Sequence, residues 1–302
     1  MAFYNILPVI HYITAIYNAG SSNGYLKRTI SSIQNQAGLG ENYEVIMHAV
    51  DDKSPDDTAD VLKELAAHDS RIMATVNEQN MRLSGVRNFA MGQAVEIMGD
   101  DDYVAFLDGD DYLMPGHLDH VIGFMKQYPD IDVFHGQPFI DGKEDIVAPY
   151  ERRIVNVHET TFEGVLFIRG KALKQAYAQD QKLFADGVPG RAIGHAFLEK
   201  LIVEHGMKLA YLPGCRVGYN RQIANESITA KEMRELKHEM GIKSDDDISI
   251  KDNPDELLKY DPNNPDTAPK SSLLPKLTGA EKYYTEELPL PAHYPKHKAL
   301  KL

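Results

Sequence analysis

Apolar strand-like runs and amphipathic helix-like segments alternate through the first two-thirds of the chain, and this alternation constrains the fold more than any other feature. The strand-like runs are residues 9–17, 44–50, 71–76 and 103–107. Segments with apolar residues at helical spacing follow them at 25–34, 55–67, 84–98 and about 115–128. Strands joined by helices predict an α/β fold with a parallel sheet covered on both faces.

The second half of the chain is less regular and then changes in composition. Strands are expected near 131–135 and 164–168, a helix at 191–205 ended by Gly206, and a strand at 207–212. Beyond about residue 230 the sequence becomes rich in proline, asparagine and aspartate. We therefore expect a domain at 1–230 and a C-terminal helical and proline-rich extension at 231–302. The extension is expected to pack on the domain, to support homo-oligomers or to contact the acceptor.

The charge balance and the apolar runs bear on the partners and the cellular compartment. The 302 residues include 45 acidic and 32 basic side chains, for a net charge of −13, so no nucleic-acid partner is expected. The single cysteine, Cys215, allows no intrachain disulfide and fits a reducing compartment. No apolar run is long enough to span a bilayer, and the first 18 residues lack a basic leader. A cytoplasmic protein is expected, with peripheral membrane attachment left open.

Two acidic clusters follow predicted strands, where parallel sheets bind ligands. Asp51 and Asp52 follow one strand, and Asp108, Asp110 and Asp111 follow another in the sequence DGDD. In an extended segment, the side chains of Asp108 and Asp110 point to the same side. Such a pair repels unless a cation lies between the carboxylates, and hard oxygen ligands suit Mn²⁺ or Mg²⁺. The alternative is a polar turn that is rich in aspartate.

The stretch VDDKSPDDT, residues 50–58, carries signals of a helix start. Ser54 is a suitable N-cap, Pro55 suits the first turn, and Asp57 stands three residues after the cap. This interpretation leaves Asp51 and Asp52 unexplained, because they precede the cap. A carboxylate at that position can accept hydrogen bonds from a base or a ribose.

Four motifs in order over about 110 residues resemble the family 2 glycosyltransferases, which have the GT-A fold of nucleotide-diphospho-sugar transferases. They are Tyr17-Asn18, DDKSPDDT, the segment from Asn80 to Arg87-Asn88, and DGDD. Alone, Asn80 would be a turn residue and Arg87 a surface charge. The resemblance implies a Rossmann-like mixed, mostly parallel sheet flanked by helices, and it continues more loosely to about residue 230.

The resemblance also implies a role for each matching residue. Ala15 and Tyr17 would line the nucleobase pocket, and Asp52, with Asp51, would hold the uracil or ribose. Asn80 and Arg87 would approach the base and diphosphate, Asp108 would touch the ribose or the metal's water, and Asp110 would ligate Mn²⁺ or Mg²⁺. The implied reaction moves a sugar, with inversion, from a UDP-sugar or other nucleotide-sugar donor to a hydroxyl of a glycan or other polymer.

The chain departs from the family pattern at the catalytic base. Where the family has Glu-Asp, this chain has Gly194-His195. His195 can act as a general base near neutral pH, and Glu199, one turn along the helix, can orient it. The alternative is a structural His195 with the base elsewhere, for instance at Asp186. The third metal ligand is not identified, because no histidine follows Arg221 at the position where many relatives have one.

Two other functions stay open. A binding or scaffold protein that kept the nucleotide pocket and lost the base would also carry Gly194-His195. A nucleotidyltransferase would need basic residues in the glycine-rich loop after the first strand, but here the first is Lys27, in the following helix. The identities of the sugar and the acceptor do not follow from the sequence.

Overall fold

A seven-stranded sheet with the strand order β3-β2-β1-β4-β8-β6-β9 forms the centre of the fold. The computed structural model describes residues 7–22, 24–113, 116–135, 139–140, 166–186, 193–211 and 217–219. The sheet contains β1 (Val9–Ile16), β2 (Glu44–Asp51), β3 (Ile72–Val76), β4 (Tyr103–Phe106), β6 (Val133–His135), β8 (Leu166–Arg169) and β9 (Leu209–Tyr211). β8 runs antiparallel to both of its neighbours, and the other pairs are parallel. The expected mixed, mostly parallel sheet is confirmed, whereas the predicted extension at 231–302 lies outside the described residues.

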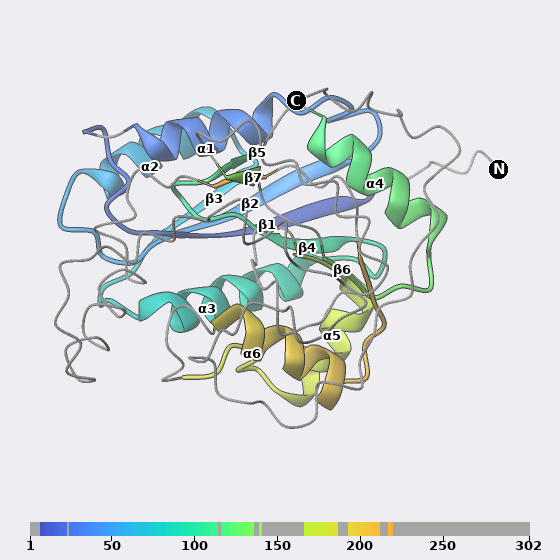
Figure 1. The fold of residues 1–302 in the computed structure, drawn as a ribbon. Helices are drawn as coiled ribbons and strands as arrows, with labels where there is room; N and C mark the ends of the chain where they lie inside the picture. The colour runs from blue at the N-terminus through green and yellow to red at the C-terminus, as the bar shows by residue number, and fades with distance from the viewer. Residues whose placement is uncertain are drawn as a thin grey trace, which may run out of the picture. The chain divides into compact units, whose positions relative to one another are not determined.

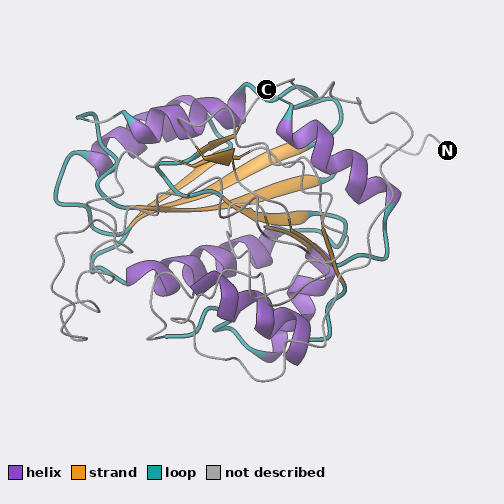
Figure 2. Cartoon of the chain, in the orientation of Figure 1, coloured by secondary structure: helices purple, strands orange, loops and turns teal. Residues whose placement is uncertain are grey.

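Helices cover both faces of this sheet (Figures 1 and 2). One face carries α1 (Tyr25–Gln34), α2 (Thr58–His68) and α4 (His117–Gln127). The other carries α3 (Arg82–Ile97), α5 (Gly170–Gln179) and α6 (Ile193–Glu199), which continues as a π-helical turn, η3 (Lys200–Glu204). A second, small sheet joins β5 (Tyr112–Leu113), β10 (Val217–Tyr219) and β7 (Phe139–Ile140). Among the described helices, none is both long and apolar enough to cross a bilayer.

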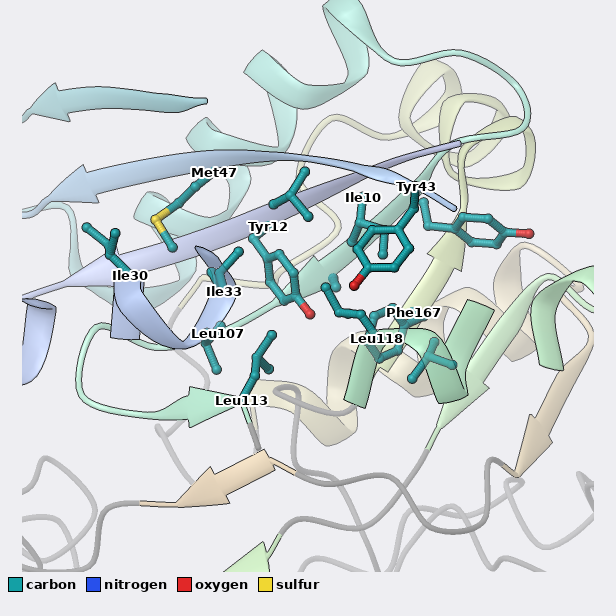
Figure 3. Packing of buried hydrophobic residues seen from close by; sticks show 14 of the residues in the cluster. Ile10, Tyr12, Ile30, Ile33, Tyr43, Met47, Leu107, Leu113, Leu118 and Phe167 are labelled. Atoms are coloured by element: carbon teal, nitrogen blue, oxygen red, sulfur yellow. The ribbon is translucent and has the colours of Figure 1, made fainter. Parts of the chain in front are cut away.

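The two helical layers produce two apolar cores, one on each face of the sheet. Alternate residues of β1 point to opposite faces, so that Tyr12 packs with α1 and α4 while Ile13 packs with α3. Figure 3 shows the Tyr12 ring among Ile33, Leu113 and Leu118 in the first core. All four residues of β4 are buried, as expected for a strand covered on both faces.

The predicted elements agree with the structure for the longer segments, but the start of α2 was predicted wrongly and α5 was missed. α1 has the expected bounds, and β2 and β4 end within one residue of theirs. Ser54 does not start α2, which begins at Thr58, so the capping-box interpretation is wrong. α5 was not predicted, because it follows β8 directly and buries mainly the small side chains Ala172 and Ala176 beside Leu173.

The main sheet carries buried histidines at positions 11, 48 and 135. The rings of His11 and His48 stack, with Nδ1 of His11 3.0 Å from Nε2 of His48. Burial and the neighbouring His11 lower the pKa of His48 to about 4. Burial also lowers the pKa of His135 to about 4, and neither ring nitrogen of His135 has a hydrogen-bond partner among the described residues. Both rings are therefore neutral in the folded chain near pH 7.

We expect acid to destabilise the fold through these histidines. An unfolded histidine titrates near pH 6.5, so between about pH 4 and 6.5 the unfolded chain binds more protons. Acidification from pH 7.5 to 5.5 should then lower the free energy of unfolding by about 1 kcal/mol for each of the two residues. Urea unfolding of His135→Leu at both pH values should show a smaller difference than the wild type. Removing the exposed His68 as His68→Leu should leave the difference unchanged, and an equal effect of both variants would contradict the assignment.

Three of the described residues other than glycine adopt positive φ angles, all in connections at the carboxyl edge of the sheet. They are Asn18 after β1, Lys53 after β2 and Arg82 where α3 begins, with φ between 54° and 59°. An L-residue with a Cβ is strained in this conformation, most of all when its side chain is neither asparagine nor aspartate. Arg82 and Lys53 therefore lower the stability of the two connections that they occupy.

Replacing the strained arginine by glycine should stabilise the chain. Arg82→Gly removes the Cβ conflict, and we expect the free energy of unfolding to rise by about 0.5–1 kcal/mol. Gln79→Gly, at a nearby exposed position without a positive φ, is the matched control and should lower it. Urea unfolding of both variants tests this expectation. Equal destabilisation by the two glycines would show that the Arg82 backbone is not strained.

Candidate functional site

The acidic turn after β4 lies directly against the end of β1. β1 pairs in parallel with β2 on one side and with β4 on the other, so the strand order reverses its direction between β1 and β4, where doubly wound folds bind ligands. The backbone N–H of Gly109 donates to the Ala15 carbonyl at 3.1 Å. A Cβ at Gly109 would lie 3.1 Å from a side-chain carbon of Ile16. Glycine therefore lets the turn pass close enough to bring Asp108 and Asp110 beside the end of β1.

Arg87 is buried and pairs with the first aspartate of this turn. Its side chain is 2% exposed, and Nη2 donates to Oδ1 of Asp108 at 2.9 Å. The guanidinium also lies 5.8 Å from the centre of the Phe106 ring and 5.4 Å from that of Phe184. The Asp108 side chain is 36% exposed, so the ion pair extends from the protein interior to the surface of the site. The resemblance implies that Arg87 approaches the base and diphosphate and that Asp108 touches the ribose or the metal's water, and the structure brings the two residues together.

Ionisation of Asp110, the second aspartate of this turn, is disfavoured. Burial, and then the charge of Asp108, raise the pKa of Asp110 to about 6, while the Arg28 guanidinium opposes this shift. Two neighbouring carboxylates at the open edge of a sheet suit a divalent cation bound by hard oxygens. The described residues contain no cluster of three or more metal-binding side chains, so water and a ligand's own oxygens would complete the coordination.

Asp52, predicted to hold the uracil or ribose, binds the start of α3. Oδ1 accepts from Asn77 Nδ2 at 2.9 Å and from the Met81 N–H at 2.7 Å, and Oδ2 accepts from the Arg82 N–H at 2.9 Å. The carboxylate thus satisfies N–H groups that have no partner inside the helix. Asn80 Nδ2 donates to the Asp52 carbonyl at 3.1 Å. The structure groups Asp52 with Asn80, and contact with a nucleotide stays a prediction.

Asp51 is enclosed and interacts with Ser54. Its carboxylate accepts hydrogen bonds from the Ser54 hydroxyl and, at 3.3 Å, from the Ser54 N–H. Burial raises the pKa of Asp51, although the hydrogen bonds from Ser54 oppose the shift. These contacts explain why Ser54 does not cap α2.

The segment from Ser54 to Thr58 anchors the loop that follows β1. Four successive backbone N–H groups, at residues 18–21, donate to side-chain oxygens of Ser54, Thr58, Asp56 and Asp57 respectively. A Cβ at Gly20 would lie 2.0 Å from an Asp57 oxygen, so this approach requires glycine. The motif predicted to cap its own helix instead fixes a neighbouring loop, which begins beside Tyr17.

The proposed nucleobase residues lie where this anchored loop leaves β1. Tyr17 is 52% exposed, and Ala15 is partly buried against the second core. An exposed aromatic ring beside a fixed loop offers a surface on which a base can stack. The location fits the predicted role, which stays a prediction.

The candidate catalytic base lies on α6, which covers the same face of the sheet as α3 and α5. His195 is in the first turn of α6, and its side chain lies outside what the structure describes. Asp186, the alternative base, is exposed and pairs with Lys182 at 3.0 Å. Phe197 of α6 stacks on Phe184 with ring centres 4.0 Å apart, and Phe184 also contacts Arg87. α6 is therefore packed against the same aromatic group as the Arg87–Asp108 pair.

Asn88 is a functional neighbour to which the sequence gave no role. Its Nδ2 donates to the Phe184 carbonyl at 2.8 Å, and its Oδ1 accepts from the Phe184 N–H at 2.9 Å. This pair of bonds holds Phe184 over the Arg87 guanidinium. The adjacent Arg-Asn in the sequence was the available signal.

The comparisons with known proteins concern the family and the fold. The glycosyl transferase family 2 model matches residues 12–197, more than half of the chain. An uncharacterised glycosyltransferase of Methanocaldococcus jannaschii is 29% identical over 145 residues, covering 48% of this chain and 47% of that protein. The putative teichuronic acid biosynthesis glycosyltransferase TuaG of Bacillus subtilis is 33% identical over 123 residues, covering 41% and 44%. The chain spans about half the length, or less, of these curated relatives.

A solved structure shows the same fold. The crystal structure of S. aureus TarS 1–349 in complex with UDP-GlcNAc aligns with a TM-score of 0.55 at 17% identity, covering 84% of this chain and 71% of that one. Its likeness confirms the expected GT-A-type sheet. Together with the family match over residues 12–197, the fold shows that this chain belongs to glycosyl transferase family 2.

Proposed function

We propose that this chain is an inverting, metal-dependent glycosyltransferase that moves a sugar from a UDP-linked donor to a hydroxyl of a glycan or other polymer. The observation that carries the proposal is the pairing of Arg87 with Asp108 beside Asp110 at the switch point of the sheet. The family supports the reaction class. The UDP-GlcNAc complex of TarS and the polysaccharide-related name of TuaG support the donor and acceptor classes.

Asp110, with Asp108, would hold Mn²⁺ or Mg²⁺. When bound, the cation would neutralise charge on the leaving diphosphate. Asp108 is held by Arg87, so its second oxygen stays available toward the open edge of the site. Arg87 keeps this carboxylate fixed, because its guanidinium lies close to the rings of Phe106 and Phe184.

His195 is the proposed general base. It would take the proton of the acceptor hydroxyl, whose oxygen attacks the anomeric carbon on the face opposite the diphosphate. The C–O bond to the diphosphate breaks as the new glycosidic bond forms, so the product has inverted configuration. A neutral imidazole can accept a proton near pH 7. We place the reaction in the cytoplasm, with membrane attachment left open.

The alternative is a nucleotide-sugar-binding protein without transfer activity, and Gly194-His195 favours it. Calorimetric titration with UDP, GDP, CDP and dTDP, each with and without Mn²⁺, is the first test. Binding of UDP that requires Mn²⁺ supports the proposal. UDP binding without any sugar transfer or donor hydrolysis would favour the alternative, and no nucleotide binding would reject both.

Asp110→Ala should abolish metal-dependent UDP binding and transfer. The variant removes the proposed metal ligand, and we expect transfer to fall by about 100-fold or more, since the leaving diphosphate loses its counter-charge. Calorimetry with UDP and Mn²⁺, together with an initial-rate assay of donor consumption, measures both effects. Asp101→Ala, which removes an exposed aspartate before β4, is the control and should match the wild type. Transfer by Asp110→Ala at a near wild-type rate would overturn the metal assignment.

His195→Ala should slow transfer by about tenfold or more and leave UDP binding unchanged. The same rate assay and calorimetry separate the two effects. His205→Ala, which follows the π-helical turn at the other end of this helical segment, is the matched control. A normal rate in His195→Ala would move the base to another residue, and lost UDP binding would indicate a role in the nucleotide pocket.

A further inference from the structure

Helix α1 carries a row of polar side chains that contact the acidic turn and the residues after it. Arg28, Thr29, Ser32 and Gln36 recur at the spacing of one helix face and continue just past its end. The face that packs on the sheet consists of Leu26, Ile30 and Ile33. Thr29 and Gln36 are nevertheless buried. The polar row therefore faces protein, and its partners lie about 80 residues further along the chain.

Thr29 makes the most central of these contacts. Its hydroxyl oxygen lies 2.6 Å from the Asp111 carbonyl oxygen, 3.0 Å from that of Gly109 and 3.1 Å from that of Tyr25. A helical threonine usually donates to the carbonyl four residues earlier, here Tyr25. Here the Asp111 carbonyl is the nearest acceptor for the single hydroxyl proton. One hydroxyl thus joins α1 to carbonyls on both sides of Asp110.

Further contacts on the same row hold the turn on either side of Thr29. Arg28 Nη2 donates to the Asp110 carbonyl at 2.8 Å, and its guanidinium lies 4.5 Å from the centre of the Tyr112 ring. The Leu113 N–H donates to the Ser32 hydroxyl at 2.9 Å. The turn is therefore fixed by α1 through its backbone and not through the side chains of Asp108 and Asp110.

Gln36 extends the row to α4. Its Oε1 accepts from the Leu118 N–H at 3.1 Å, and its Nε2 donates to the Ser32 carbonyl at 3.0 Å. Leu118 lies in the first turn of α4, whose N–H groups have no partner within the helix. The same row therefore fixes both the turn and the helix that follows it.

We propose that Thr29 is a positioning residue for the metal site, supported by Ser32 on the same helix. This inference rests on the proposed metal-dependent function. The Thr29 hydroxyl bonds the Asp111 carbonyl, with the Gly109 carbonyl 3.0 Å away, and so sets the direction in which Asp110 projects relative to Asp108. Without that bond the two carboxylates separate and bind a divalent cation less tightly, because carboxylate ligands depend on the residues that orient them.

The test is Mn²⁺ binding to the full chain in the presence of saturating UDP, measured by electron paramagnetic resonance of free Mn²⁺. Thr29→Val keeps the shape of the side chain and removes the hydroxyl, and we expect Mn²⁺ affinity to fall by about tenfold. Thr29→Ser keeps the hydroxyl and should stay within about threefold of the wild type. In the transfer assay, Thr29→Val should need more Mn²⁺ for half-maximal rate and recover its kcat at saturating Mn²⁺.

Ser31→Ala is the matched control, because it removes a hydroxyl from the exposed face of the same helix. It should bind Mn²⁺ like the wild type. Folded Thr29→Val with wild-type Mn²⁺ affinity would overturn the inference, as would equal losses in Thr29→Val and Thr29→Ser. A lower melting temperature with unchanged Mn²⁺ affinity would show that Thr29 has only a structural role, and it would also overturn the inference.

If Thr29→Val does not fold, Ser32→Ala replaces it in the same Mn²⁺-binding experiment. It removes the acceptor of the Leu113 N–H and should weaken Mn²⁺ binding several-fold, while unchanged affinity would overturn the inference. Failure of the proposed function has a different signature. The wild type itself would then bind no Mn²⁺ with UDP, whatever the behaviour of the α1 variants.

Discussion

The carboxylates at the carboxyl edge of the sheet lie beside buried strands and need hydrogen-bond or ion-pair partners. The residues that supply these partners determine the rest of the site. A buried carboxylate is costly unless it is paired or accepts hydrogen bonds. The buried Asp52 accepts from N–H groups at the start of α3, and the buried Asp51 accepts from Ser54. The exposed Asp56 and Asp57 accept from the loop after β1. Asp108 is paired with a buried guanidinium. Much of the acidic cluster therefore makes structural contacts, whereas burial and the charge of Asp108 oppose the ionisation of Asp110.

These contacts hold three connections between strands and helices in place. The loop after β1 is held by residues 54–58, the start of α3 is held by Asp52, and the turn after β4 is held by α1. Each contact joins segments that are distant in the chain but adjacent at one edge of the sheet. The tolerated strain at Lys53 and Arg82 fits this picture, since strained backbone persists where surrounding contacts determine it.

The sequence predicted the layers of the fold because hydrophobic periodicity reports burial directly. It could not predict β5, β7 or β10, which are two or three residues long, too short for any period. α5 was missed for a related reason, as its buried face consists largely of alanine and glycine. The start of α2 was placed too early because Ser54 has the local chemistry of a cap, yet its hydroxyl is used by Asp51 and by the backbone of Asn18.

The candidate site was predictable in its acidic residues and not in the residues that hold them. DGDD and Arg87 could be singled out from residue type and order. The burial of Arg87 depends on Phe184, almost 100 residues away, and the contacts of Thr29 depend on a turn about 80 residues away. On an amphipathic helix, Thr29 and Ser32 look like part of the solvent face. Only tertiary packing, which no local pattern encodes, brings that face into contact with the acidic turn.

Rigid support and cation affinity are linked in such a site. Two like charges that are free to move separate, and the repulsion between them is lost before any ligand arrives. Two like charges held together keep that repulsion until a cation relieves it, so the relief adds to the binding free energy. The free energy needed to hold Asp110 beside Asp108 must then come from contacts that do not themselves bind the cation. Backbone hydrogen bonds to α1 meet this requirement, because they fix the turn without occupying a carboxylate oxygen.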